Sequence, residues 1–118
     1  MAGNLVHFEL GAKDTARARE FWGSLFGWQF RPPWGGMEYH MTEGLQPGGA
    51  IMEADPGCPI VYFDSDDIDA SIARIRELGG EADDKQPIPT VGWFARCKDS
   101  EGNSFSLFQS DESVPMPS

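Results

Sequence analysis

Residues 5–31 read LVHFELGAKDTARAREFWGSLFGWQFR, and this stretch decides the fold. It opens with the alternation of apolar and polar residues that is typical of a strand. It continues with an acidic helix start and an amphipathic helix, and it reaches a second strand after Gly27. A weaker copy, IVYFDSDDIDASIARIRELGGEA, occupies residues 60–82. The repetition predicts one supersecondary unit used twice.

Both predicted helices carry start and stop signals. Asp14 is the expected N-cap of the first helix, and Asp66 or Asp67 that of the second. The apolar stripe of the first helix consists of Ala18, Phe21, Trp22, Leu25 and Phe26. The stripe of the second consists of Ile68, Ile72, Ile75 and Leu78. Glycines follow both stripes, as expected at helix ends.

The remaining apolar segments complete two βαβββ modules. Strands are expected at residues 5–10, 28–31, 37–42 and 49–53, and again at 60–64, 81–86, 93–98 and 104–109. The predicted class is α+β, with one cupped mixed β-sheet and a helix covering each half. We expect a single domain over residues 1–110, with module one at 4–54, module two at 59–109 and a flexible tail at 111–118.

Composition excludes several classes of partner. Nineteen acidic and nine basic residues among 118 give a net charge of −10, which repels nucleic acid. No run approaches the roughly 20 apolar residues of a membrane span, so no membrane association is expected. Cys58 and Cys97 lack the CxxC spacing of a zinc or redox pair. Two such thiols favour a cytoplasmic protein.

Five motifs resemble one known superfamily. They are LVHFEL with the Phe21–Trp22 pair, LFG at 25–27, GGAIME at 48–53, DDIDA…ELGG at 66–80 and DSEGNSFSL at 99–107. In this order they resemble the vicinal oxygen chelate superfamily of glyoxalases, bleomycin-resistance proteins and extradiol dioxygenases. The resemblance covers nearly the whole chain and implies the fold predicted above. It does not select an activity, because isomerases, dioxygenases and metal-free binding proteins share this scaffold.

The resemblance also implies positions for metal ligands. In metal-dependent members the ligands lie on the first, fourth, fifth and eighth strands. These positions fall on His7, Glu53, Ile60 (or Tyr62 if the repeat is shifted by two) and Ser106. Only His7 and Glu53 are suitable donors, whereas a catalytic site needs at least three. We therefore expect an incomplete metal site. A divalent metal at His7 and Glu53, completed by water or a partner chain, is the alternative.

Strand alternation selects the other candidate residues. Val6, Phe8 and Leu10 share one face of the first strand, so His7 and Glu9 share the other. The expected ligand-binding residues are His7, Glu9, Glu53, Tyr62, Trp93 and Ser106. His7 and Glu53 are also the catalytic candidates, as a general acid–base pair.

The interpretation that follows is a glyoxalase- or bleomycin-resistance-like protein that binds a small organic molecule in the cup of the sheet. The alternative is a metal-dependent lyase, isomerase or dioxygenase that uses His7 and Glu53. The sequence leaves open whether any reaction is catalysed and which ligand is bound. We expect a homodimer, because sheet edges and aromatic side chains require cover.

Overall fold

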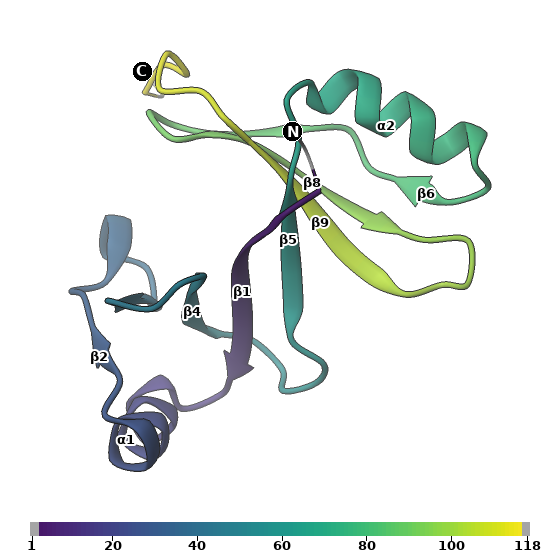
Figure 1. Ribbon diagram of the computed structural model, residues 1–118. Helices are drawn as coiled ribbons and strands as arrows, with labels where there is room; N and C mark the ends of the chain where they lie inside the picture. The colour runs from purple at the N-terminus through teal and green to yellow at the C-terminus, as the bar shows by residue number, and fades with distance from the viewer. Residues whose placement is uncertain (1–2, 117–118) are drawn as a thin grey trace. The chain divides into compact units, whose positions relative to one another are not determined.

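The computed structural model of the chain describes residues 3–116 (Figure 1). They divide into two compact units, one covering Val6–Val61 and the other the remaining described residues. Module one is the half of the chain that lies mainly in the first of these units, and module two is the half that lies mainly in the second. Module one is built from β1 (Leu5–Ala12), α1 (Thr15–Phe26), β2 (Gln29–Phe30), the 3-10 helix η1 (Trp34–Gly36), β3 (Tyr39–Glu43) and β4 (Gly48–Glu53). Module two is built from β5 (Ile60–Asp64), α2 (Ile68–Glu77), β6 (Glu81–Ala82), β7 (Gln86–Ile88), β8 (Gly92–Lys98) and β9 (Ser104–Ser110).

The two modules repeat one topology. The strand order is β2-β3-β4-β1 in module one and β5-β9-β8-β6 in module two, where β7 also pairs with β8. In each module the first strand pairs in parallel with the last, and the other pairs are antiparallel. The α+β class and the twofold use of a βαβββ unit are thereby confirmed.

The predicted helix signals are also confirmed. The Asp14 side chain accepts a hydrogen bond from the backbone N–H of Arg17 (3.0 Å), and Asp67 accepts one from Ala70 (3.1 Å). These bonds satisfy N–H groups that have no partner inside the helix. Gly27 ends α1 in the left-handed conformation with φ of 74°, where a side chain would be strained.

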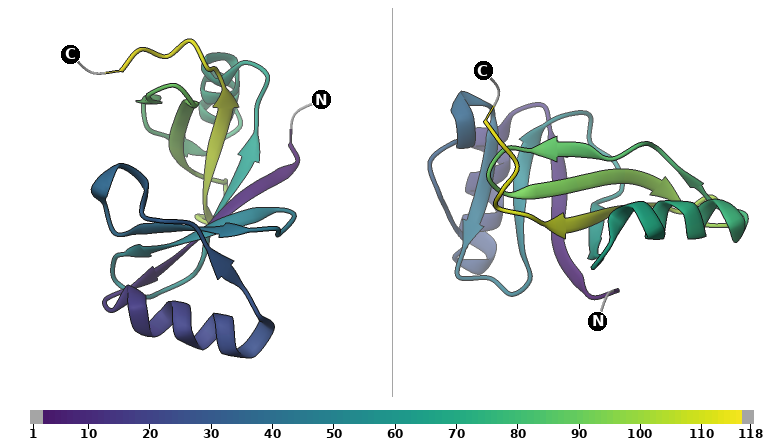
Figure 2. Two further views of the ribbon diagram at one scale, coloured as in Figure 1. Left: turned by 90° about the vertical axis from the view of Figure 1, so that its left-hand side faces the viewer. Right: turned by 90° about the horizontal axis from the view of Figure 1, so that it is seen from above.

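In module two, α2 lies along one face of β8 and β9 (Figures 1 and 2). The core beneath it consists of Ile68, Ile72, Ala95, Cys97 and Leu107. Because side chains alternate along a strand, the neighbours of Ala95, Cys97 and Leu107 point away from the helix. We call the sheet face opposite the helix of the same module the helix-distal face.

In module one, α1 covers the face that carries Phe8. The Phe8 ring lies 6.0 Å from the ring of Trp28, which stacks on Trp22 of α1 at 5.0 Å. Gly49 pairs with Phe8, and a Cβ atom at Gly49 would collide with the Phe8 ring. His7 and Glu9 alternate with Phe8 and therefore lie on the helix-distal face.

Two predictions about the second half need correction. The stretch expected to be a loop after residue 86 begins with β7, in which Pro87 pairs with Trp93; a proline is tolerated there because β7 is an edge strand. The segment expected to be flexible from residue 111 is held down as far as it is described. Val114 is buried, its carbonyl accepts from Thr90 (2.9 Å), and Asp111 donates to Val91 (2.9 Å). Residues 117 and 118 lie outside the described chain.

Candidate functional site

The polar cluster of module one is centred on Tyr39. The Tyr39 hydroxyl donates to Glu9 Oε2 at 2.7 Å, and it lies 2.7 Å from His7 Nε2. All three side chains belong to the helix-distal face, since Tyr39 precedes His40 on β3 and alternates with it. Glu9 is only 5% exposed. The Tyr39 phenol therefore links the imidazole of His7 to the buried carboxylate of Glu9.

The direction of these bonds fixes the protonation of His7. Because the Tyr39 proton is given to Glu9, the phenol oxygen accepts from His7 Nε2–H, and Nδ1 carries the lone pair of the neutral ring. Burial lowers the pKa of His7 from its ordinary value of 6.5, and the charge of Glu9 raises it in part. The imidazole is thus neutral at pH 7, the state in which it accepts a proton.

The structure does not bring Glu53 into this cluster. His7 pairs with Gly48 across the β1–β4 ladder, whereas Glu53 pairs with Ala12. Five residues of strand separate the two positions, about 17 Å along the ladder, and the odd offset turns Glu53 toward the opposite face. Glu53 is also exposed. The structure therefore does not bring the two catalytic candidates His7 and Glu53 together. The sequence could not reveal this, because it does not display the register between β1 and β4.

In module two the structure brings Tyr62 and Ser106 together as predicted. They are direct partners in the parallel β5–β9 ladder, on the helix-distal face. Tyr62 is 6% exposed and Ser106 is fully buried.

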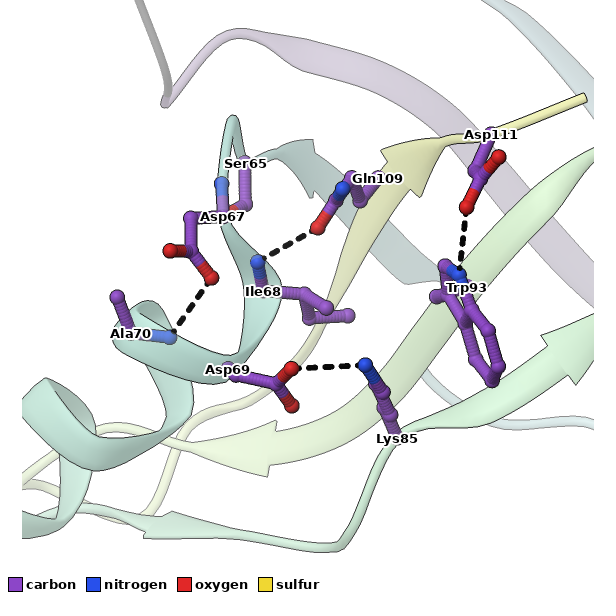
Figure 3. Close-up of polar contacts among 9 residues, drawn as sticks. All are labelled: Ser65, Asp67, Ile68, Asp69, Ala70, Lys85, Trp93, Gln109 and Asp111. Atoms are coloured by element: carbon purple, nitrogen blue, oxygen red, sulfur yellow. Dashed lines mark hydrogen bonds and ion pairs between the residues drawn. The ribbon is translucent and has the colours of Figure 1, made fainter. Parts of the chain in front are cut away.

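Trp93, by contrast, lies on the helix-covered side. It packs against the α2 core, with Lys85 Nζ 4.5 Å above its ring, and its indole N–H donates to Asp111 at 3.1 Å (Figure 3). Lys85 in turn reaches Asp69 in the first turn of α2 at 2.7 Å. Trp93 thus packs near the start of α2 and, contrary to what we expected from the sequence, does not lie with Tyr62 and Ser106.

Three residues of these faces were missed from the sequence. They are Tyr39, Phe94 and Arg96. Alternation with His40 could have identified Tyr39, and alternation with Cys97 could have identified Arg96. Arg96 pairs with Ser106 across β8 and β9, and its Nη1 donates to Ser106 Oγ at 3.0 Å.

The donors at the four implied metal positions do not fit a divalent ion. Tyr62 and Ser106 supply a phenol and an alcohol where an imidazole or carboxylate is needed, and Glu53 is remote from His7. Within residues 3–116, no group of three or more His, Cys, Asp or Glu side chains is placed to hold a metal.

His40 and Cys97 have structural roles. His40 is buried on the α1 side, where its Nε2 lies 3.3 Å from Glu38, which also accepts from Thr15 at the start of α1 (2.5 Å). Burial, with the charge of Asp83, raises the pKa of the Cys97 thiol to about 11. The thiol is therefore protonated and unreactive at neutral pH.

Comparison with known proteins decides the family. The glyoxalase-like domain family matches residues 6–108 of the sequence. The chain belongs to this family. A glyoxylase-like domain-containing protein of Didymella fabae is 27% identical to this glyoxalase-like domain, over 89% of the chain and 92% of the relative. The resemblance to the vicinal oxygen chelate superfamily is thereby confirmed.

Solved structures support the same fold. Streptomyces coelicolor methylmalonyl-CoA epimerase, in complex with 2-nitronate-propionyl-CoA, superposes with a TM-score of 0.67 at 16% identity, covering 99% of this chain and 100% of the epimerase chain. A glyoxalase/bleomycin resistance protein/dioxygenase superfamily member from Vibrio splendidus gives 0.71 at 13% identity, covering 93% and 100%. At these identities the likeness shows the fold of the glyoxalase-like domain and not its activity. In the part of the chain described, neither helix has the length and apolar character needed to traverse a bilayer.

Proposed function

We propose that this protein binds a small organic ligand at the helix-distal faces of its modules, without a complete metal site. The observation that carries the proposal is the chain His7–Tyr39–Glu9, in which a carboxylate that is 5% exposed is held on the sheet face opposite α1. Burial of a carboxylate is costly unless it is hydrogen-bonded, and packing alone would be served by apolar residues. Polar groups with fixed donors and acceptors instead provide orientation and specificity for a ligand.

A second candidate, an enzyme of the isomerase or lyase type, is favoured by the state of His7. Its lowered pKa gives a neutral imidazole at pH 7, which suits a general base. This candidate uses His7 without Glu53 and without a metal. The metal-dependent alternative has lost its support, because Glu53 does not reach His7.

The test is a fragment screen by saturation-transfer NMR in the presence of EDTA. The library contains neutral, anionic and cationic fragments and is applied to the wild type, His7→Ala and His40→Ala. The two variants make the same chemical change on opposite faces of one sheet. His7→Ala is expected to weaken fragment binding at least fivefold, whereas His40→Ala is expected to lower stability without changing affinity in the folded protein.

The result that overturns the proposal is equally defined. If no fragment of any charge binds, or if every hit survives in His7→Ala and is lost in folded His40→Ala, the helix-distal face of module one is not the site. Proton exchange into the same fragments, followed by NMR, distinguishes an enzyme from a binding protein.

We also propose that the protein forms a homodimer through α1 in the cytoplasm. Phe21, Leu25 and Phe26 on α1 are 59%, 56% and 62% exposed. A contiguous apolar patch of this kind is typical of an interface, and two copies of the same patch are self-complementary about a twofold axis. Free Cys58 and Cys97 fit a reducing compartment.

Sedimentation velocity tests the dimer. Phe21→Ser combined with Phe26→Ser is expected to shift the wild-type dimer to monomer. Leu78→Ser changes an equally exposed apolar residue at the C-cap of α2 (62%) and is expected to leave the dimer intact. The proposal is contradicted if the wild type remains monomeric over a 100-fold range of protein concentration that extends to the solubility limit.

A further inference from the structure

A short segment near the C-terminal end of the described chain is bonded to the turn between β7 and β8. We call residues 111–114 the strap. At its start, the Asp111 N–H donates to the Val91 carbonyl at 2.9 Å. At its end, the Val114 carbonyl accepts from the Thr90 N–H at 2.9 Å, and the Val114 side chain is 4% exposed. The strap is therefore fastened to the turn at both ends.

The strap has a third fastening through a side chain. The Asp111 carboxylate accepts from the indole N–H of Trp93 at 3.1 Å (Figure 3) and from the backbone N–H of Ser113 at 3.0 Å. Trp93 is itself held in place, since Lys85 Nζ lies 4.5 Å from the centroid of its ring. The closed strap thus combines backbone bonds, a carboxylate bond and one buried apolar side chain.

The turn that holds the strap contains a strained residue. Pro89 and Thr90 are its central residues, and the Val91 N–H closes it by donating to the Ile88 carbonyl at 2.9 Å. Thr90 has φ of 62° and is the single non-glycine residue with positive φ among residues 3–116. This conformation is unfavourable for a β-branched side chain, and glycine is the usual residue at such a turn position. Strain persists only where surrounding contacts impose it, so the bond from Thr90 to the strap links closure of the strap to the strain.

We propose that the strap opens as a unit while the rest of module two stays folded, and that the left-handed Thr90 sets how often it opens. In the closed state the bonds of the strap and the burial of Val114 offset the strain, whereas in the open state Thr90 relaxes. Opening uncovers the Thr90 N–H, the Val91 carbonyl and the Trp93 indole N–H. These are groups with which an extended peptide segment pairs its own backbone and acidic side chains. The strap therefore acts as a built-in gate over this end of module two.

Amide hydrogen exchange of the full chain, followed by NMR, tests the opening. Local opening requires less free energy than global unfolding. The amides of Thr90 and Asp111, which donate across the boundary between turn and strap, are therefore expected to show similar protection, well below that of the most protected amides of β8 and β9. Protection of both as high as in those strands, or a difference between the two amides of more than about tenfold, overturns the inference.

Variants of Thr90 test the role of the strain, with the Asp111 amide as the readout. Thr90→Gly is expected to raise the protection of this amide by about threefold or more, because glycine adopts positive φ without strain. Thr90→Val is the matched control, since it keeps the β-branched shape and is expected to leave the protection nearly unchanged. Equal protection of Asp111 in the two variants, or a loss of protection in Thr90→Gly, overturns the role of Thr90.

A variant of the strap tests whether its two ends open together. Val114→Ala removes buried methyl groups and is expected to lower the protection of Thr90 and Asp111 alike, by about fivefold or more. Met116→Ala is the control, because Met116 lies just beyond the strap and is 67% exposed. A loss confined to Thr90, or an equal loss in Met116→Ala, contradicts opening as a unit. If Val114→Ala does not fold, the Thr90 variants decide. None of these outcomes bears on ligand binding, so the inference and the proposed function fail separately.

Discussion

The helices α1 and α2 occupy equivalent places in the two modules, yet they bury their apolar residues to very different extents. In α2, Ile68 is 1% and Ile72 is 6% exposed, and both pack on the strands beneath. In α1, Phe21, Leu25 and Phe26 are all more than half exposed. One repeated unit therefore serves as a self-contained core in module two and as a core plus an apolar outer surface in module one.

The difference follows from the size of the side chains under each helix. The branched isoleucines of α2 fit between Ala95, Cys97 and Leu107. Module one instead stacks large rings on one another, with Trp22 on Trp28 and Phe26 beside both at 6.0 and 5.9 Å. Aromatic rings in a cluster at one end of a helix leave part of their area uncovered. The comparison teaches that periodicity alone does not reveal how much of a stripe is buried.

The largest expected effect contrasts truncations in the two helices. Ile72→Ala removes a core side chain and is expected to lower the free energy of unfolding by about 3 kcal/mol. Leu25→Ala removes an exposed one and is expected to cost less than about 0.5 kcal/mol at concentrations where the chain is monomeric. Urea denaturation measures both. Equal losses would show that the two stripes are buried alike, which contradicts the comparison.

Substitutions at two glycines compare how the strands of the two modules tolerate an added Cβ atom. A Cβ atom at Gly92 of β8 would collide with the backbone oxygen of Gln109, whereas one at Gly49 of β4 would collide with the Phe8 ring. Because a ring can shift and a ladder backbone cannot without breaking its hydrogen bonds, Gly92→Ala is expected to cost about 2 kcal/mol and Gly49→Ala about 1 kcal/mol. Thermal and urea unfolding give the values, and a reversed order refutes the argument.

The N-caps are expected to be equivalent even though the helices differ in burial. Asp14→Ala and Asp67→Ala each remove a side-chain acceptor for a backbone N–H in the first turn. Each is expected to lower stability by about 1 kcal/mol. Asp14→Asn and Asp67→Asn keep the acceptor and serve as controls with smaller losses. A cap effect confined to one helix would mean that the modules differ in helix initiation as well as in packing.

The smallest effect is a pH dependence that belongs to module one, which holds both histidines of the chain. Burial lowers the pKa of His7 in the folded state below its usual 6.5, so between these two values the unfolded chain binds more protons. Stability is therefore fully present above pH 6.5 and falls as the pH drops through the folded-state pKa. The free energy of unfolding at pH 7.5 and 5.5 is expected to differ more in the wild type than in His7→Gln. The same difference in both proteins would exclude His7 as its source.

The sequence was sufficient for the parts of the fold that depend on local signals. The caps at Asp14 and Asp67, the glycine after α1 and the alternation that separates His7 from Phe8 are written in neighbouring residues, and the structure agrees with each. The loop expected at Pro87 was mispredicted because a proline argues against a central strand, whereas Pro87 pairs with Trp93 in an edge strand. The contacts of Asp111 and Val114 with Val91 and Thr90 join distant parts of the chain and have no local signal.

Alternation along each strand predicted which site residues share a face, but the sequence did not predict how the strands pair. His7 with Glu9, and Tyr62 with Ser106, share faces as expected. Glu53 and Trp93 were placed wrongly because a one-residue change of register moves a side chain to the other face. Register depends on long-range pairing, which neighbouring residues do not display.

The central claim is that small molecules bind the helix-distal faces without added metal. Intermolecular nuclear Overhauser effects, measured in EDTA with the tightest fragment from the screen, test it most directly. We expect contacts from the fragment to ring protons of Tyr39, Tyr62 or Phe94, and no contacts to His40 or Trp93 on the helix-covered faces. Contacts confined to His40, Trp93 or the exposed rings of α1, or binding that appears only after a divalent metal is supplied, would contradict it.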